Sequence, residues 1–447
     1  MAAGTISEQD ISAGTVVSSC PIASGVGFRV LNEGGNAIDA AVATGLALAV
    51  TYPQAGNLGG GGFMMIHEHS SGTDEFLDFR ERAPAGSNVK IYEKPEDSVI
   101  GGKGVGVPGT IAGFDAALKH YGTWSLEKLA GMVAELADVG HWLTRRQWKA
   151  YHAYKGLLSK FDETRRVFVP NGRSPQSGTR FRQPDLARAL NRIAELGAEG
   201  FYKGEIAESM VKVTQATGGV MTLEDIESYE VRWREPICCN FGDSELMTAP
   251  LPSAGGILVR QVLRLMEESG IIDAPIDSPE RLSYLARAFR VAFVTRSRAL
   301  ADPDYHKIDA DSLDYIHRAD LKSLEALVAR EQTATDLAQP GHTRSTTHFA
   351  VLDPDGNAVS CTYSLNTLFG SKLTVPGFGF LLNNSIDDFT INPELRNWYQ
   401  LLDSPNNTIM PLHRPVSSMT PTIVLKDGEV QVLVGGAGGP MIPTLTT

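Results

Sequence analysis

Three adjacent hydroxyl residues, Ser345, Thr346 and Thr347, stand where a polar stretch of the sequence meets a strand-like one. The preceding segment EQTATDLAQPGHTRS is typical of an exposed connection, whereas THFAVLD has the pattern of a strand. A cut before Thr346 would give this residue both a hydroxyl and a free α-amine. Because an α-amine has a pKa of about 8, it can accept the hydroxyl proton without a His or Asp partner. A Ser/Thr run before a strand is also a common structural feature, so spacing alone leaves this nucleophile a hypothesis.

Two other motifs indicate little chemistry. Residues 104–109 read GVGVPG and match GxGxxG, but no strand precedes them and a helical pattern follows, which argues against a dinucleotide site. His67-Glu68-His69 supplies two imidazoles without a third ligand, and an exposed strand end explains them equally well. We therefore predict that the protein uses neither a metal nor a cofactor.

The elements that must position these residues are mainly helices before residue 330. Ser125 suits the cap of a helical pattern that ends at Gly140, and Pro184 begins another that ends at Gly197. Residues 37–50, AIDAAVATGLALAV, are too few for a membrane span and predict a buried helix of small side chains. Helical periodicity recurs over residues 257–266 and 282–293.

Hairpins replace helices after residue 330. The strand patterns THFAVLD and AVSCTYSL flank PDGN, and the patterns TIVL and EVQVLVG flank KDG. A helical section joined by a polar connection to a hairpin-rich section predicts an α+β fold with sheets covered by helices.

Composition restricts the class of protein. Of the 447 residues, 42% are hydrophobic and 21% charged, which suits a soluble globular protein with a large core. The net charge of −12 argues against nucleic-acid or anionic-membrane partners. Four cysteines without a CxxC motif predict neither a disulfide framework nor a zinc knuckle. The first residues do not resemble a signal peptide, so the sequence as written predicts a cytoplasmic protein.

Longer motifs carry a family resemblance from about Val16 to the last residue. In chain order they are GGNAIDAAVA, YPQAGNLGGGGF, DFRERAPA, GVPGTIAGF, FYKGEIAE, MTLEDIESYEVRWREP, PSAGGI, TTHFAVLD, LNTLFGS, LLNNSIDDF, RPVSSMTPT and GGAGGP. In these motifs the sequence resembles the γ-glutamyltranspeptidase family of N-terminal-nucleophile hydrolases. The resemblance implies a four-layer αββα sandwich, made as one inactive precursor. This precursor cuts itself into a large subunit, residues 1–345, and a small subunit, residues 346–447, within one structural domain.

The resemblance also implies an activity and its catalytic residues. The activity is transfer or hydrolysis of the γ-glutamyl group of glutathione and related amides, with water, an amino acid or a peptide as acceptor. The cut falls between Ser345 and Thr346, and Thr346 is the nucleophile in both self-cleavage and turnover. Ser364 stands where the family has a second threonine and keeps the supporting hydroxyl. Gly438 and Gly439 match a glycine pair whose N–H groups form the oxyanion hole, because glycine allows a close approach.

A second group of residues is implied in binding the amino-acid end of the substrate. Arg80, in DFRE, matches the residue that grips the α-carboxylate, although taken alone it suits a surface ion pair with a nearby acid. Asp388 matches the acid that holds the α-ammonium, with the amide of Asn366 beside it. The remaining matches are a serine pair that assists Arg80 and a tyrosine on a lid loop: Ser417, Ser418 and Tyr399.

Departures from the family pattern leave alternatives open. Ser385 stands where relatives usually have a Gln or Glu that contacts the α-ammonium, so a related amidohydrolase with a different acyl group, of the cephalosporin acylase or small-amide hydrolase type, is an alternative. The chain stops just past Gly439, where relatives continue, so we expect a sandwich without its last strands and helices. A non-catalytic fragment that never cleaves is a further alternative. Because family members are commonly exported, a start upstream of Met1 would imply a periplasmic or extracellular protein.

Overall fold

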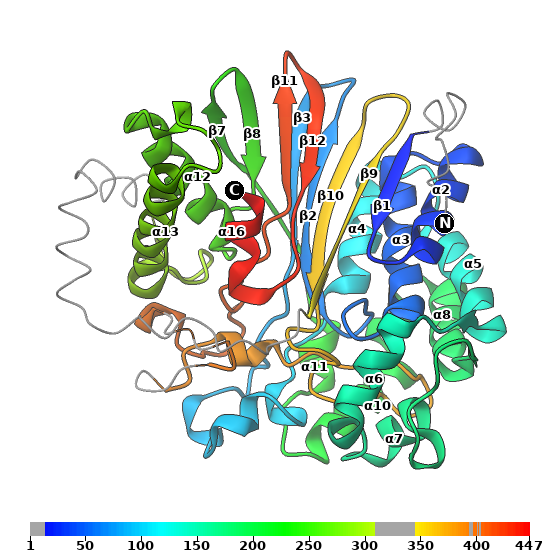
Figure 1. Cartoon of the computed structure of the whole chain (residues 1–447). Helices are drawn as coiled ribbons and strands as arrows, with labels where there is room; N and C mark the ends of the chain where they lie inside the picture. Colours follow the sequence, from blue (N-terminus) through cyan, green and yellow to red (C-terminus); the bar gives the residue numbers. More distant parts are fainter. Residues whose placement is uncertain (1–13, 309–344, 393–396, 400, 402–403) are drawn as a thin grey trace.

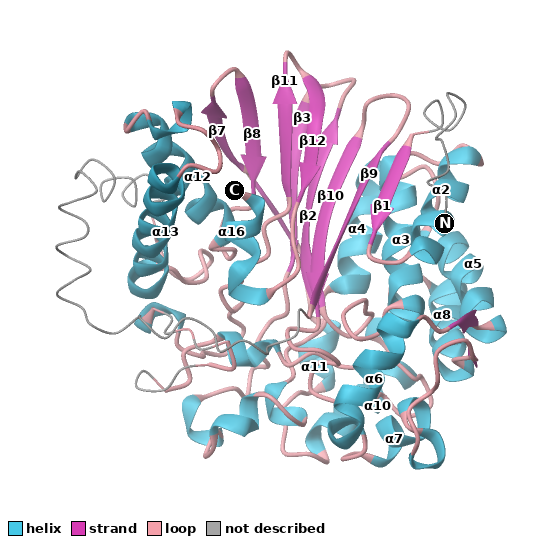
Figure 2. Ribbon diagram, viewed as in Figure 1, coloured by secondary structure: helices cyan, strands magenta, loops and turns pink. Residues whose placement is uncertain are grey.

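The computed structural model describes residues 14–308, 345–392, 397–399, 401 and 404–447. Two antiparallel sheets pack face to face, and helices cover the outer face of each (Figure 1, Figure 2). The expected four-layer αββα sandwich is therefore confirmed. In the part of the chain that is described, no helix combines the length and apolar character needed to cross a membrane.

The larger sheet has the strand order β1-β9-β10-β2-β3-β6. Its strands are β1 (Thr15–Ser18), β2 (Gly61–Glu68), β3 (Thr73–Phe79), β6 (Arg232–Arg234), β9 (Thr346–Leu352) and β10 (Ala358–Ser364). Strands β9 and β10 form the hairpin predicted around PDGN. Their register places Thr346 directly opposite Ser364, at the end of the hairpin away from its turn.

The smaller sheet has the strand order β12-β11-β8-β7. Its strands are β7 (Ile237–Phe241), β8 (Ser244–Thr248), β11 (Thr422–Lys426) and β12 (Glu429–Val434), and a short pair, β4 (His141–Trp142) and β5 (Arg180–Phe181), lies apart from it. Strands β11 and β12 form the hairpin predicted around KDG. Segments on both sides of residue 346 contribute strands to both sheets, so the two predicted subunits are interleaved in one structure.

Helix α3 (Ala37–Thr51) lies at the centre of the layer that covers the larger sheet, and every one of its residues is buried. Its many alanines allow close packing, and the Asn36 side chain caps it by accepting the N–H groups of Ile38 and Asp39. Both this helix and the helix capped by Ser125 are confirmed. The layer also contains α2 (Pro21–Asn32), α4 (Thr110–Tyr121), α5 (Leu126–Val139) and α8 (Pro184–Leu196); smaller helices are α6 (Arg145–Leu158), α7 (Asp162–Phe168), α9 (Glu199–Tyr202), α10 (Glu205–Gln215) and α11 (Leu223–Glu227).

The opposite layer covers the smaller sheet with α12 (Gly255–Glu268) and α13 (Pro279–Ala299), and α16 (Ile442–Thr446) packs against α12 (Figure 1). These helices confirm the periodicity predicted over 257–266 and 282–293. Leu246 of β8 packs against Val259 and Leu263 of α12, which joins this layer to its sheet.

A separate apolar core lies between the two sheets. Phe63 and Met65 of β2 contribute to it together with Met247 and Ile423 of the smaller sheet. The intervening β2 residues, such as Met64, belong instead to the core beneath α3, as the two-residue period of a strand requires. The polar connection predicted before Thr346 lies outside the described residues, except for Ser345.

Candidate active site

Thr346 is the first residue of β9, and Ser364 is the last residue of β10. Their hydroxyl oxygens lie 3.2 Å apart, and both residues are buried. The backbone N–H of Asn366 donates to Ser364 Oγ at 2.9 Å. This bond occupies one of the two lone pairs of Ser364 Oγ, so the other lone pair and the hydroxyl proton stay available and either hydroxyl can donate to the other. The hairpin register thus places a hydrogen-bonding hydroxyl beside the predicted nucleophile.

Replacing Ser364 by Ala is expected to lower kcat by about 10-fold, because loss of a buried hydrogen bond of about 1.5 kcal/mol leaves the Thr346 hydroxyl unoriented. Ser364→Thr, which retains a hydroxyl at this position, is the matched control and should keep a rate near that of the parent. Steady-state release of aniline from a γ-glutamyl anilide measures both. Equal rates for the Ala and Thr variants would contradict the supporting role.

Tyr399 lies over the predicted cleavage site. Its hydroxyl donates to the backbone carbonyl of Asn366 at 2.6 Å, so it accepts from Ser345 Oγ, which is also 2.6 Å away. Ser345 is 1% exposed, and it precedes the nucleophile in the uncut chain. The predicted lid tyrosine therefore bridges the residue before Thr346 and the loop after Ser364.

Gly438 and Gly439 lie at the turn that leads into α16. Their φ values are 149° and 56°, in the region that favours glycine. A Cβ atom at Gly439 would lie 2.7 Å from Cε1 of Tyr399, so this position cannot take a side chain without displacing the tyrosine. Gly439 lines the same pocket as Thr346. The oxyanion hole stays a prediction, and of the two glycines only Gly439 is in the described pocket lining.

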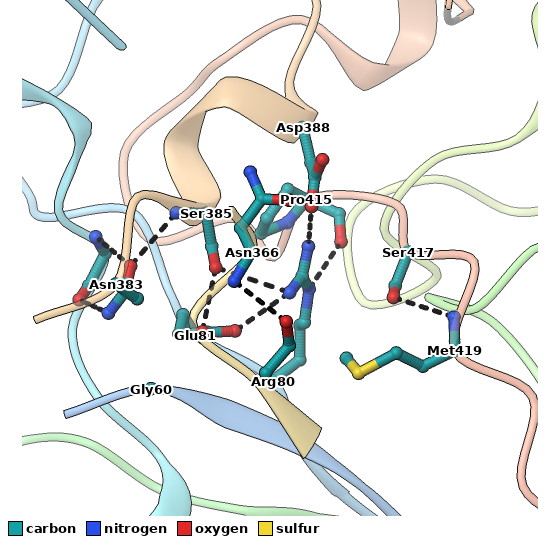
Figure 3. Close-up of polar contacts among 12 residues, drawn as sticks. Gly60, Arg80, Glu81, Asn366, Asn383, Ser385, Asp388, Pro415, Ser417 and Met419 are labelled. Carbon is teal, nitrogen blue, oxygen red and sulfur yellow. Dashed lines mark hydrogen bonds and ion pairs between the residues drawn. The ribbon is translucent and has the colours of Figure 1, made fainter. Parts of the chain in front are cut away.

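Arg80 directly follows β3, and only 1% of its side chain is exposed. Its Nη1 donates to Glu81 Oε2 at 2.9 Å, and its Nη2 donates to Asp388 Oδ2 (Figure 3). Its Nε donates to the carbonyl of Pro415 at 3.3 Å. The interpretation of Arg80 as part of a surface ion pair is therefore wrong. Its guanidinium is buried and lines the pocket together with Asp388.

Asp388 ends a 3₁₀ turn, Ser385–Asp388. Burial raises its pKa to about 7, although the positive charge of Arg80 acts in the opposite direction. A carboxyl group with this pKa changes its charge near neutral pH, so its ability to bind a cation depends on pH.

Ser385 lies behind the pocket rather than in its wall. It is fully buried, and its hydroxyl donates to Glu81 Oε1 at 2.8 Å while it accepts from Arg80 Nη1 at 3.4 Å (Figure 3). Glu81, absent from the predicted site residues, therefore joins Ser385 to Arg80. The position that departs from the family pattern supports the guanidinium from the interior.

The asparagines of the LLNN motif fix the loops around this turn. Asn383 Nδ2 donates to the carbonyls of Gly59 and Gly106, and Asn383 Oδ1 accepts from the N–H of Gly106 and of Ser385. Asn366 Nδ2 donates to the carbonyl of Asn384 at 3.0 Å, so the predicted substrate-binding amide is held against the same turn. The GxGxxG loop therefore packs against the loop of Asn383 through Gly106. A 3₁₀ turn and not a strand precedes it.

Ser417 and Ser418 form the opposite wall of the pocket. The N–H of Ser417 donates to the carbonyl of Pro252, and its carbonyl accepts from the N–H of Ala254, both at 2.8 Å. The PSAGGI motif therefore positions the serine pair. Arg296 of α13, which is absent from the predicted site residues, donates to Ser418 Oγ.

A single pocket brings most of these side chains together. Its described lining consists of Arg80, Arg296, Thr346, Ser364, Asn366, Asp388, Tyr399, Leu401, Ser417, Ser418, Met419, Gly439, Pro440 and Ile442. Ser345, Ser385 and Gly438 are predicted site residues outside this lining. Over the described residues no group of three His, Cys, Asp or Glu side chains could hold a metal ion, and His67 contacts Asp74 instead.

Comparisons with known proteins show what this chain is similar to. A glutathione hydrolase proenzyme of Pseudomonas sp. (strain A14) is 39% identical in an alignment that covers 97% of this chain and 77% of that protein. The crystal structure of Helicobacter pylori γ-glutamyltranspeptidase is 37% identical with a TM-score of 0.67, and the match covers 73% of this chain and 94% of that one. The crystal structure of cephalosporin acylase from Bacillus halodurans is 26% identical with a TM-score of 0.80, covering 96% and 78%.

The family model described as Gamma-glutamyltranspeptidase matches residues 23–447, which includes every residue of the pocket. With this match over nearly the whole chain and the αββα sandwich around Thr346, the chain belongs to the γ-glutamyltranspeptidase family.

Proposed function

We propose that this protein is a self-processing γ-glutamyl transferase and hydrolase that acts on glutathione and other γ-glutamyl amides. One observation carries the proposal: the Thr346 hydroxyl, supported by Ser364 at 3.2 Å, lies in the same pocket as the buried Arg80–Asp388 pair. The first feature is suited to acyl transfer, and the second to binding the charged end of an amino acid.

In the proposed self-cleavage, Thr346 Oγ1 attacks the carbonyl carbon of Ser345. The C–N bond between the two residues breaks as an ester forms on Thr346 Oγ1, and the proton of the hydroxyl passes to the departing amine. Water then hydrolyses the ester, which frees the Ser345 carboxylate and leaves Thr346 with a hydroxyl and an α-amine. That amine is the base that turnover requires, so cleavage and activity are coupled.

In the proposed turnover, Thr346 Oγ1 attacks the γ-carbonyl of the substrate while its α-amine takes the proton. The developing oxyanion lies near the Gly438–Gly439 backbone, where a fixed N–H donor contributes about 3 kcal/mol to lowering the barrier. The amide nitrogen leaves with a proton, and an ester of the γ-glutamyl group with Thr346 remains. Water gives glutamate and hydrolysis; an amino-acid or peptide amine gives transfer.

Recognition of the γ-glutamyl group follows from the charges in the pocket. The Arg80 guanidinium suits the α-carboxylate, with the hydroxyls of Ser417 and Ser418 beside it, and the Asp388 carboxylate suits the α-ammonium. A zwitterionic substrate end therefore supplies one partner for each member of the existing Arg80–Asp388 pair.

Binding of the α-ammonium is expected to weaken as the pH falls through about 7, because Asp388 then takes up a proton and loses its charge. We expect the inhibition constant of L-glutamate to rise up to about 10-fold per pH unit below this value. Glutarate, which lacks the amine, is the matched ligand and should show no such rise. A pH-independent constant for L-glutamate between pH 5 and 8 would contradict the assignment.

The experiment that tests the proposed function is incubation of the processed protein with a γ-glutamyl anilide, with and without an acceptor dipeptide. Aniline release, increased by the acceptor, is the expected result. A fully processed protein that releases no aniline would overturn the proposal.

A related amidohydrolase with a different acyl group is the second candidate function. It is favoured by the orientation of Ser385, whose hydroxyl faces Glu81 instead of the pocket, so that one contact to the α-ammonium in relatives is replaced. The structural similarity to a cephalosporin acylase is in accord with this alternative. Faster hydrolysis of glutaryl anilide than of γ-glutamyl anilide would select it.

A further inference from the structure

Arg296 is a buried guanidinium in the pocket wall to which the proposed reaction gives no role. It lies in the last turn of α13, is 2% exposed, and lines the pocket with Thr346, Arg80 and Asp388. Its place beside the substrate end of the pocket indicates a use there.

The contact between Arg296 and Ser418 fixes the direction of a proton. Arg296 Nη1 donates to Ser418 Oγ, and a guanidinium has no acceptor, so the hydroxyl proton of Ser418 must point elsewhere. Ser417 Oγ likewise acts as an acceptor, from the N–H of Met419 at 3.1 Å, and this bond does not use its hydroxyl proton. Both serines therefore have their protons available for an anionic group in the pocket.

Arg296 also acts on Asp388 through its charge. Three charged groups act on this carboxyl: Arg80 from the end of β3, Arg296 from α13 and Asp387 from its own turn. The two arginines lower the pKa of Asp388, and Asp387 raises it. Tyr399 packs on the same region and is neutral, since burial raises the pKa of its hydroxyl. Removing Arg296 leaves Arg80 as the single cation among these groups that opposes protonation of Asp388.

We propose that Arg296 is a positioning residue for the amino-acid end of the substrate: from the same pocket wall it orients the Ser418 hydroxyl toward the α-carboxylate and favours the ionised form of Asp388, which binds the α-ammonium. This inference rests on the proposed function. It assigns to one side chain, on a helix remote in sequence from the nucleophile, an effect on both charges of the substrate.

The test compares Arg296→Met and Arg296→Lys with Arg298→Met, a control in the same helical turn whose side chain is exposed and outside the pocket lining. For Arg296→Met we expect the KM for γ-glutamyl anilide to rise about 10-fold and kcat to stay within about 3-fold of the parent. We also expect the acid limb, which is the rise of the L-glutamate inhibition constant at low pH, to move to higher pH. Arg296→Lys, which keeps the charge but not the planar fork, should restore the acid limb. Arg298→Met should match the parent in all three measurements.

Two results would overturn the inference. One is an Arg296→Met variant with the parent's KM and acid limb. The other is an Arg296→Lys variant whose acid limb moves as far as that of Arg296→Met, since the retained charge would then have no effect on Asp388.

Should Arg296→Met fail to fold or to cleave itself, Arg296→Lys and Ser418→Ala, singly and combined, complete the test. Each single variant is expected to raise KM, and the double variant should raise it no further than Ser418→Ala alone. Additive effects would contradict action through Ser418. A parent protein without γ-glutamyl activity marks failure of the proposed function, whereas an active parent with unaffected variants marks failure of this inference.

Discussion

Replacing Thr346 by Ala is expected to leave the protein as a single uncut chain of 48.1 kDa without measurable γ-glutamyl activity. The substitution removes the hydroxyl that is proposed to attack the Ser345 carbonyl, and without the cut no α-amine forms to act as the proposed base. Because nucleophile and base reside on one residue, their losses cannot be separated, and we expect activity to fall by about 1,000-fold or more. A denaturing gel after prolonged incubation and an anilide assay measure the two effects.

The matched control for this prediction is Thr347→Ala. Thr347 is the adjacent hydroxyl residue, is fully buried, and contacts Ser19 Oγ at 3.0 Å on the other face of β9. Its replacement should leave cleavage into residues 1–345 and 346–447 intact. If Thr346→Ala still cuts at the same bond, another group is the nucleophile. If the parent chain itself stays uncut through long incubation, the hypothesis of a non-catalytic fragment gains support.

Local sequence chemistry was sufficient for several helices and for both hairpins that follow residue 345. Ser125 caps α5, Pro184 begins α8, and both predicted hairpins form around PDGN and KDG. These features depend on interactions among residues close in the chain, which turn and capping preferences describe well. The packing of the two sheets depends on contacts such as Phe63 with the smaller sheet, and no local pattern specifies such contacts.

Candidate site residues could be named from the sequence where they lie on a recognisable motif, and most of them line one pocket. Thr346 stood out from its position between a polar connection and a strand, yet its pairing with Ser364 required the register of the hairpin. Arg80 illustrates the limit: the adjacent acid in the sequence suits an exposed pair, whereas the fold buries both charges. Arg296 has no local sequence signal, because its contact with Ser418 depends on α13 packing beside a loop more than a hundred residues further along the chain.

Replacing Arg80 by Met is expected to lower kcat/KM for γ-glutamyl anilide by about 100-fold or more and to destabilise the folded protein by about 3 kcal/mol. The first effect follows from loss of the partner for the α-carboxylate. The second follows because Glu81 and Asp388, both buried, lose a shared cation. Kinetics of the soluble variant measure the first effect, and its thermal unfolding measures the second.

The two effects can be separated because the proposed substrate contact involves Arg80 and not Glu81, whereas both residues contribute to stability. In Arg80→Met/Glu81→Gln the buried carboxylate becomes a neutral amide that can still accept from Ser385, so part of the stability should return while the high KM remains. Arg234→Met is the converse control: Arg234 is ion-paired with the buried Asp78, lies outside the pocket lining, and should lower stability with little change in KM. A double variant that regained the parent KM would mean that Arg80 serves only to neutralise Glu81. The α-carboxylate would then need another partner in the pocket, and Arg296 is the other guanidinium of the described lining.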